Sequence, residues 1–212
     1  MKLQFNKKSP LKVLCLGAHS DDIEIGAGGT ILKLIDEYQI EEITWIVFSS
    51  NEIRKKEAIL SAEKFLTEVS NKNIEVKDFR DGFLPFHAIE VKEFFEELKK
   101  SGTPDIIFTH YRNDRHQDHR LISDLTWNTW RSHFILEYEI PKYDGDLGNP
   151  NFYVQLEDAH ISKRNQILLE TFVSQAGKHW FDDATFKALA RIRGMESATL
   201  FAEAFYSRKL FF

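Results

Sequence analysis

Residues 13–30 read VLCLGAHSDDIEIGAGGT. The stretch begins with an apolar run that predicts a buried strand, and the residues after it, 31–38, carry apolar side chains at helical spacing. His19 and two adjacent carboxylates, Asp21 and Asp22, lie between the predicted strand and the predicted helix. Open α/β sheets bind ligands at the carboxyl ends of their strands. The stretch therefore predicts an α/β fold with polar chemistry at the position where such folds bind ligands.

The rest of the chain alternates between strand and helix patterns. We expect strands at 12–16, 43–48, 74–79, 105–109, 134–140 and 151–156, helices at 26–38, 51–68, around 91–98, 116–133, 161–173 and 183–192, and a strand or short helix within 199–212. Strands that alternate with helices, with connections long enough to cross over the sheet, predict a Rossmann-like three-layer fold, in which helices cover both faces of a mostly parallel sheet. No repeat, low-complexity tract or linker divides residues 1–212, so we expect a single domain.

Composition narrows the class of protein. The net charge of −5 argues against general binding to nucleic acid or to an anionic membrane. The one cysteine, Cys15, falls inside the first predicted strand, which indicates core packing and a reducing compartment. Residues 1–10 lack the apolar segment of a signal peptide, and no run of about 18 apolar residues predicts a membrane span. We expect a cytoplasmic protein with no nucleic-acid partner.

A second polar cluster follows the predicted strand at 105–109. It reads HQDH and contributes His116, Asp118 and His119. Strands of a parallel sheet end at the same edge, so this cluster and the one at His19 would meet if their strands were near neighbours. Imidazoles combined with carboxylates suit a divalent ion such as Zn²⁺. A catalytic zinc uses three protein ligands, which leaves carboxylates free to act as a general base or to orient a histidine.

Each feature also has an ordinary structural explanation. A histidine followed by paired aspartates is typical of capping and turns. Gly26, Gly28 and Gly29 resemble a phosphate loop, but they lack the G-x-G-x-x-G spacing and the P-loop lysine, which favours close backbone packing at a helix start. His110, at the end of a predicted strand, fits a structural or supporting position better than that of a ligand.

Arg54 and Asp81 each allow two interpretations. Arg54 can contact a substrate, or it can pair with Glu52 or Glu57 on a solvated helix face. Asp81 can contact a substrate, or it can form a turn with Gly82.

The two polar motifs together resemble those of the LmbE-like, or PIG-L, family of zinc-dependent N-deacetylases. That family includes deacetylases of mycothiol, bacillithiol and glycosylphosphatidylinositol biosynthesis. Its first motif corresponds to residues 18–30 and its second to residues 116–119. The pair at 114–115, just before the second motif, also matches the family. Ser20 stands where the family usually has proline, which loses some rigidity of the loop but removes no ligand. The resemblance extends to Arg54, Glu57, Asp81, Gly82 and residues 202–205.

The resemblance implies a role for each matching residue. His19, Asp22 and His119 match the zinc ligands, and Asp21 matches the general base. His116 matches the histidine that, when protonated, stabilises the oxyanion, and Asp118 matches the residue that orients this histidine. Arg54 and Asp81 match positions that line the sugar site. It further implies removal of an N-acetyl group from an N-acetylglucosamine-type sugar or conjugate. Zn²⁺ is the implied cofactor, although Fe²⁺ and Co²⁺ accept the same ligands. A homotrimer or homohexamer is implied in the same way.

Other functions stay open on the residues alone. The same site could hydrolyse another amide or an ester, or the chain could be a binding protein that keeps a structural metal. Asp21 argues against the structural site, because such a site needs no spare carboxylate beside its ligands. A nucleotide-binding module is supported only by the glycines.

Overall fold

Seven strands form one sheet in the part of the chain that the structure describes, residues 5–6 and 9–210 of a computed structural model. They are β1 (Leu11–Gly17), β2 (Ile40–Ser49), β3 (Lys72–Phe79), β4 (Ile106–His110), β5 (Phe134–Tyr138), β6 (Phe152–Leu156) and β7 (Phe201–Tyr206). Their order across the sheet is β3-β2-β1-β4-β5-β7-β6. The first five are parallel, and β7 is antiparallel to both β5 and β6. The predicted, mostly parallel sheet is confirmed.

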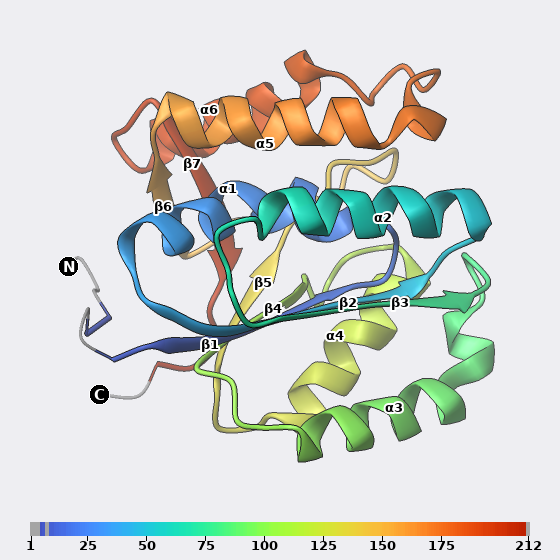
Figure 1. Cartoon of the computed structure of the whole chain (residues 1–212). Helices are drawn as coiled ribbons and strands as arrows, with labels where there is room; N and C mark the ends of the chain where they lie inside the picture. The colour runs from blue at the N-terminus through green and yellow to red at the C-terminus, as the bar shows by residue number, and fades with distance from the viewer. Residues whose placement is uncertain (1–4, 7–8, 211–212) are drawn as a thin grey trace.

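Helices cover both faces of this sheet. They are α1 (Asp22–Glu37), α2 (Glu52–Phe65), α3 (Ala88–Lys100), α4 (Gln117–Thr129), α5 (Asp158–Thr171) and α6 (Asp183–Glu196), with the short 3₁₀ helices η1 (Leu84–His87) and η2 (Val173–Gln175). In Figure 1, α1 and α2 lie above the sheet with α5 and α6 stacked beyond them, and α3 and α4 lie below it. Among the described helices, none combines the length and the hydrophobicity that a bilayer crossing requires.

The predicted ends of the chain are only partly described. Residues 1–4 and 7–8 of the segment expected to lack a signal peptide lie outside the described residues, as do residues 211–212 of the expected C-terminal element. Within that element the structure forms β7, so the strand interpretation is confirmed.

The apolar run in β1 is buried on both sides. Val13 and Cys15 belong to the core cluster shared with α1 and α2, whereas Leu14 and Leu16 belong to the cluster shared with α3 and α4. Strands of parallel sheets are covered on both faces, which explains the unbroken hydrophobic pattern. Cys15 is fully buried, as expected for a core residue.

Helix α1 begins at Asp22, four residues before the predicted start at Gly26. Its glycines therefore lie inside the helix, where neighbouring side chains approach the backbone closely. A Cβ atom on Gly28 would lie 2.9 Å from the ring of Phe65, and one on Gly29 would lie 2.7 Å from Leu156. A Cβ atom on Gly26 would collide with the buried ring of Tyr138. The close-packing interpretation of these glycines is confirmed.

This packing makes Gly26→Ala a destabilising substitution. We expect it to lower the free energy of unfolding by about 1–3 kcal/mol through overpacking against Tyr138, despite the higher helix propensity of alanine. Gly177→Ala is the matched control, because a Cβ atom there meets nothing within 4 Å. Urea unfolding of both variants measures the difference. Equal stabilities would show that Tyr138 moves aside freely.

The strand order brings the two polar motifs together. β1 lies between β2 and β4, with Cys15 paired to Phe108. The loops that follow β1 and β4 therefore leave the sheet side by side at its carboxyl edge. The expected meeting of the two clusters is confirmed.

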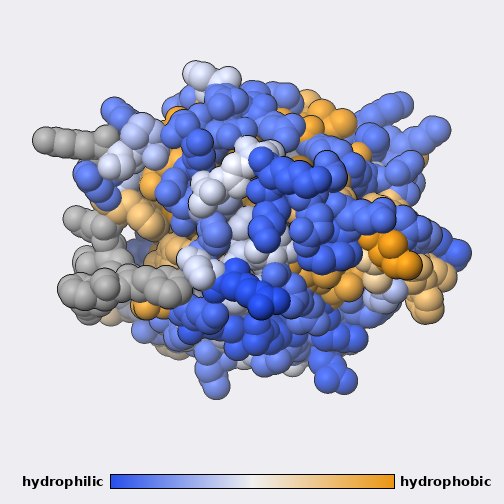
Figure 2. Space-filling model, turned by 90° about the horizontal axis from the view of Figure 1, so that it is seen from below, coloured by the Kyte–Doolittle hydropathy of each residue, from blue (hydrophilic) through white to orange (hydrophobic). Residues whose placement is uncertain are grey.

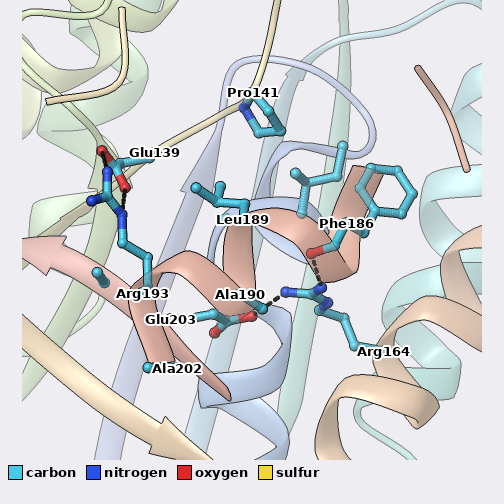
Figure 3. Close-up of a pocket in the computed structure, with 12 residues that line it drawn as sticks. Glu139, Pro141, Arg164, Phe186, Leu189, Ala190, Arg193, Ala202 and Glu203 are labelled. Atoms are coloured by element: carbon cyan, nitrogen blue, oxygen red, sulfur yellow. Dashed lines mark hydrogen bonds and ion pairs between the residues drawn. The ribbon is translucent and has the colours of Figure 1, made fainter. Parts of the chain in front are cut away.

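A cavity away from this edge contains two buried ion pairs (Figure 3). Arg164 lies 2.9 Å from Glu203, whose carboxylate also accepts hydrogen bonds from the amides of Gly29 and Thr30 in α1. On the other side, Arg193 lies 2.9 Å from the carboxylate of Glu139. Hydrogen bonds satisfy both carboxylates, so these pairs connect α1, α5, α6 and β7 rather than form a reactive site.

Candidate metal centre

The three expected metal ligands converge between β1 and β4. His19 lies in the loop after β1, Asp22 opens α1, and His119 lies in the first turn of α4. His19 Nδ1 is 3.1 Å from His119 Nε2 and 3.3 Å from Asp22 Oδ2, and the latter two atoms are 3.5 Å apart. Tetrahedral zinc with ligand bonds of about 2.0–2.2 Å separates its ligand atoms by roughly 3.3–3.6 Å. The three atoms have the spacing that such an ion requires.

Hydrogen bonds fix which nitrogen of each ring faces the centre. His119 Nδ1 is 2.9 Å from Asp114 Oδ2, and His19 Nε2 is 3.0 Å from Asp81 and 3.2 Å from Asp118. Carboxylates accept hydrogen bonds, so these outer nitrogens carry protons and the inner nitrogens are the ones that can bind a metal. With both inner nitrogens unprotonated, two lone pairs and a carboxylate oxygen this close repel one another unless a cation lies among them. The donor set therefore fits a divalent metal ion.

The electrostatics match this assignment at His119 and Asp22. At His19, burial lowers the pKa, but Asp22 and the hydrogen bonds to Asp118 and Asp81 outweigh it and raise the pKa well above its ordinary value, so this ring must release a proton when a metal binds. Burial, followed by the neighbouring His110, lowers the pKa of His119 to about 3, which keeps its ring neutral. Burial alone would raise the pKa of Asp22, but His119, His110 and His19 outweigh it and hold this pKa well below its ordinary value. Neutral imidazole and ionised carboxylate are the forms that bind metals.

His110 supports the centre without supplying a ligand. Its Nε2 accepts a hydrogen bond from the amide of Ala18 at 2.9 Å, which occupies the lone pair that a metal would need. The ring is fully buried and stacks on His119 with centroids 3.9 Å apart. It also lies 3.2 Å from Asp22 Oδ2. The supporting role expected for His110 fits these contacts.

His116 has a different partner from the one expected. It is the N-cap residue of α4, and its Nδ1 accepts a hydrogen bond from the Asp118 amide at 3.2 Å. The Asp118 carboxylate instead accepts from the amides of Gly82 (2.7 Å) and Leu84 (3.1 Å) and from His19 (3.2 Å). Burial, followed by the charge of His19, lowers the pKa of His116. We therefore assign a neutral ring with its proton on Nε2, whereas the family resemblance implies a protonated ring.

Asp21 lies beside the ligands as the N-cap residue of α1 and is buried. Arg54 Nη2 is 2.8 Å from Asp21 Oδ1, and among the described residues no hydrogen-bond donor engages Oδ2. Burial raises the pKa of Asp21, and Arg54 offsets part of that rise. Arg54 also lies 3.4 Å from Glu57 and over the ring of Phe172. The helix-face pairing expected with Glu57 is thus present, but Arg54 also reaches the site.

Asp81 combines both of its interpretations. Gly82 has φ +81°, a left-handed conformation that glycine adopts without strain, so Asp81 does precede a turn. The Asp81 side chain is 76% exposed and still reaches His19 at 3.0 Å. Hydrogen bonding to His19 lowers the pKa of Asp81.

Asp114 belongs to the pair at 114–115 that matches the family, but the sequence did not reveal its role in the centre. Its carboxylate contacts His119 Nδ1 at 2.9 Å and Lys142 at 2.8 Å, and it is buried. The available signal was an acidic residue five positions before a metal-ligating histidine. That signal is weak, because no fixed spacing relates a ligand to the carboxylate that orients it.

Comparisons with known proteins agree with the fold and the motifs. The chain is similar to N,N'-diacetylchitobiose deacetylase from Pyrococcus horikoshii, with a TM-score of 0.71 and 24% identity over 94% of this chain and 84% of that one. It is also similar to 4-carboxy-2-hydroxymuconate hydratase from Pseudomonas putida, with a TM-score of 0.72 and 15% identity over 95% and 98% of the two chains. A zinc-inhibited form of teicoplanin deacetylase matches with a TM-score of 0.69 and 12% identity, over 92% and 97%.

These structural matches establish a shared fold. Membership of a family is shown by a separate match to a family model. The family model of PIG-L, described as GlcNAc-PI de-N-acetylase, matches residues 14–130. That range includes both polar motifs and more than half of the 212 residues. The chain belongs to the PIG-L, or LmbE-like, family.

Proposed function

We propose that this protein is a metal-dependent hydrolase that removes the N-acetyl group from an N-acetylglucosamine-type sugar or sugar conjugate. The observation that carries the proposal is Asp21, a buried carboxylate beside a complete three-ligand set that does not need it as a ligand. Membership of the PIG-L family supports the choice of an N-acetyl sugar as substrate.

His19, Asp22 and His119 would hold the metal ion. A bound divalent ion supplies an activated water and polarises the carbonyl that is attacked. The donor set favours Zn²⁺, and Fe²⁺ and Co²⁺ accept the same donors. Asp114 and Asp118 hold the outer nitrogens of the two histidines and keep their inner lone pairs directed at the centre.

Asp21 is the proposed general base. Arg54 occupies Oδ1, so the proton from the attacking water goes to Oδ2. The same oxygen then returns that proton to the departing amine nitrogen. Burial raises the pKa of Asp21, which makes its protonated form a more accessible donor for the second transfer.

His116 is the proposed donor to the oxyanion of the substrate. Because the Asp118 amide occupies Nδ1, the ring proton lies on Nε2, from which a neutral ring can donate a hydrogen bond. Removing one such donor typically lowers kcat about 10²–10³-fold.

Two substitutions separate this role from helix capping. We expect His116→Asn to preserve the cap of α4, because asparagine is a favoured N-cap residue, and to lower kcat about 10²–10³-fold. His116→Ala should lose a similar factor in rate and also about 1 kcal/mol of stability. Steady-state kinetics and thermal unfolding of both variants measure the two effects. A near wild-type kcat in His116→Asn would remove His116 from the mechanism.

Acetate release from a panel of N-acetylated sugars tests the proposed function. The expected result is release that a chelator abolishes and added metal restores. Esters and other amides belong in the same panel, because the fold also occurs in a hydratase and does not by itself fix the reaction. Ester cleavage without acetate release from any N-acetyl sugar would favour a different hydrolase. The single domain, the trimer or hexamer and the cytoplasmic location stay predictions.

A further inference from the structure

One lysine outside the proposed mechanism reaches the candidate metal centre through the carboxylate of Asp114. Lys142 lies in the β5–β6 connection, which we define as residues 139–151, and its Nζ is 2.8 Å from Asp114 Oδ2. The same oxygen lies 2.9 Å from Nδ1 of His119, a proposed metal ligand. Asp114 Oδ2 therefore accepts hydrogen bonds from the lysine and from the ligand at the same time.

Three acceptors surround the ammonium group of Lys142. Besides Asp114, they are a carboxylate oxygen of Asp146 at 2.7 Å and the carbonyl oxygen of Ile140 at 3.3 Å, which together match the three donors of a lysine. Asp146 in turn accepts from the amide of Arg115 at 2.7 Å. The Lys142 side chain is only 14% exposed, and partly buried charges are screened by salt much less than exposed ones. These contacts fix the position of the ammonium group.

The β5–β6 connection that carries Lys142 is itself held near both ends. Arg193 of α6 donates to the Glu139 carboxylate at 2.9 Å (Figure 3) and to the carbonyl oxygen of Gly148 at 3.1 Å. The Glu139 carboxylate also accepts from the amide of Gly148 at 3.2 Å. Lys142 therefore approaches Asp114 from a fixed support.

The lysine restricts the carboxylate that orients His119. Asp114 Oδ1 accepts from the amide of His116 at 2.7 Å, and Oδ2 is shared between Lys142 and His119. Without the ammonium group, the buried carboxylate would lose a charged donor and could turn away from the histidine. Loss of the partner of a metal-ligating histidine typically weakens metal binding about 10–100-fold. Because Lys142 acts through Asp114, its loss should cost the lower end of this range.

We propose that Lys142 is a positioning residue of the metal centre, which fixes the Asp114 carboxylate and through it the orientation of the ligand His119. The proposal rests on the proposed function, because it takes His19, Asp22 and His119 as the metal ligands. It deepens that function by giving the β5–β6 connection a part in metal binding.

Zinc affinity tests the proposal without a measurement of activity. Competition with a chelator of known affinity gives the zinc Kd of wild-type protein and of each variant. We expect Lys142→Met, which keeps the length of the side chain but not its charge, to raise this Kd about tenfold. Lys142→Arg should restore most of the affinity, because a guanidinium can also bridge two carboxylates. A wild-type Kd in Lys142→Met would overturn the proposal.

A double variant covers the case in which Lys142→Met does not fold because two carboxylates then face each other. Lys142→Met/Asp146→Asn removes one positive and one negative charge, and asparagine can still accept from the amide of Arg115. We expect the zinc Kd of the double variant to rise about tenfold as well. A wild-type Kd in the double variant would overturn the proposal even if the single variant cannot be prepared.

The visible spectrum of the cobalt-substituted protein separates positioning from simple stabilisation. If Lys142 orients His119, the Co²⁺ bands of Lys142→Met should differ from those of the wild type, because they report ligand geometry. A lower free energy of unfolding combined with a wild-type spectrum and a wild-type zinc Kd would show that Lys142 only stabilises the β5–β6 connection. That result would also overturn the proposal.

Lys100→Met is the matched control. Lys100 pairs with Glu97 at 2.9 Å near the end of α3, where the two side chains are 72% and 71% exposed. Helix α3 lies on the face that Figure 2 shows, on which hydrophilic side chains predominate. Exposed pairs of this kind contribute little, so the zinc Kd and the cobalt spectrum should stay those of the wild type.

The same titrations distinguish failure of this proposal from failure of the proposed function. Absence of zinc binding by wild-type protein would overturn the metal centre of the proposed function. Equal zinc binding by wild-type protein and by the Lys142 variants would overturn only the role of Lys142.

Discussion

Replacing Asp21 with asparagine should leave the protein folded and able to bind zinc, and should lower the rate of acetate release about 10²–10⁴-fold, the usual contribution of a general base. Asparagine keeps the size of the side chain and can still accept a hydrogen bond from Arg54, which lies 2.8 Å from Oδ1. Its amide nitrogen cannot take up a proton from water. The loss should therefore appear in kcat/KM and not in metal content.

Kinetics and elemental analysis on the same preparations measure these two quantities. Asp78→Asn is the control, since Asp78 is an exposed carboxylate on β3. Full turnover by Asp21→Asn would exclude Asp21 as the base. Loss of bound zinc would instead make Asp21 a ligand and require a different assignment of the centre.

Replacing Glu203 with alanine should lower the free energy of unfolding by about 3–5 kcal/mol, the usual cost of removing one partner of a buried ion pair. The Arg164 guanidinium, 3% exposed, would lose its carboxylate partner. The amides of Gly29 and Thr30 would lose their acceptor, which weakens the attachment of α1 to β7. Since α1 begins at the proposed ligand Asp22, the candidate metal centre depends on this attachment.

Urea unfolding in the presence of a chelator measures this effect without a contribution from bound metal. Glu96→Ala is the matched control, because Glu96 pairs with Lys92 on the exposed surface of α3. Exposed pairs of this kind contribute little to stability. Equal unfolding free energies for the two variants would show that Arg164 finds other partners when Glu203 is absent.

The sequence was sufficient to predict which helices and strands form, but not where some of them begin and end. Asn51, where the predicted helix 51–68 begins, is the N-cap residue of α2, and its side chain accepts from the amides of Ile53 and Arg54. Ile59 recurs at helical spacing with other apolar residues of 51–68, but it is 39% exposed. The helix does bury Ala62 and Phe65, which share that spacing, but it buries Ala58 in place of Ile59, because its contact with the sheet and with α5 selects a slightly different face.

Those parts of the candidate centre that lie in the two local motifs were predictable from the sequence. The contacts that these residues make with backbone groups far away in the chain were not. The proposed ligand residues come from two local patterns, and the neighbouring positions of β1 and β4 bring them together. The partners of Asp118 were not predictable, because they are amides at Gly82 and Leu84 in a separate loop. The pairing of Asp21 with Arg54 depends equally on how α1 and α2 lie in the fold.

The most direct test of the metal centre is acetate release by chelator-treated protein as zinc is added back. Wild-type protein and the His119→Ala variant are compared, with bound metal measured in each sample. If His19, Asp22 and His119 hold the catalytic ion, release by the wild type returns in proportion to bound zinc and reaches its maximum near one ion per chain. The His119→Ala variant should then neither retain the ion nor recover activity. Full acetate release by metal-free wild-type protein would contradict the account.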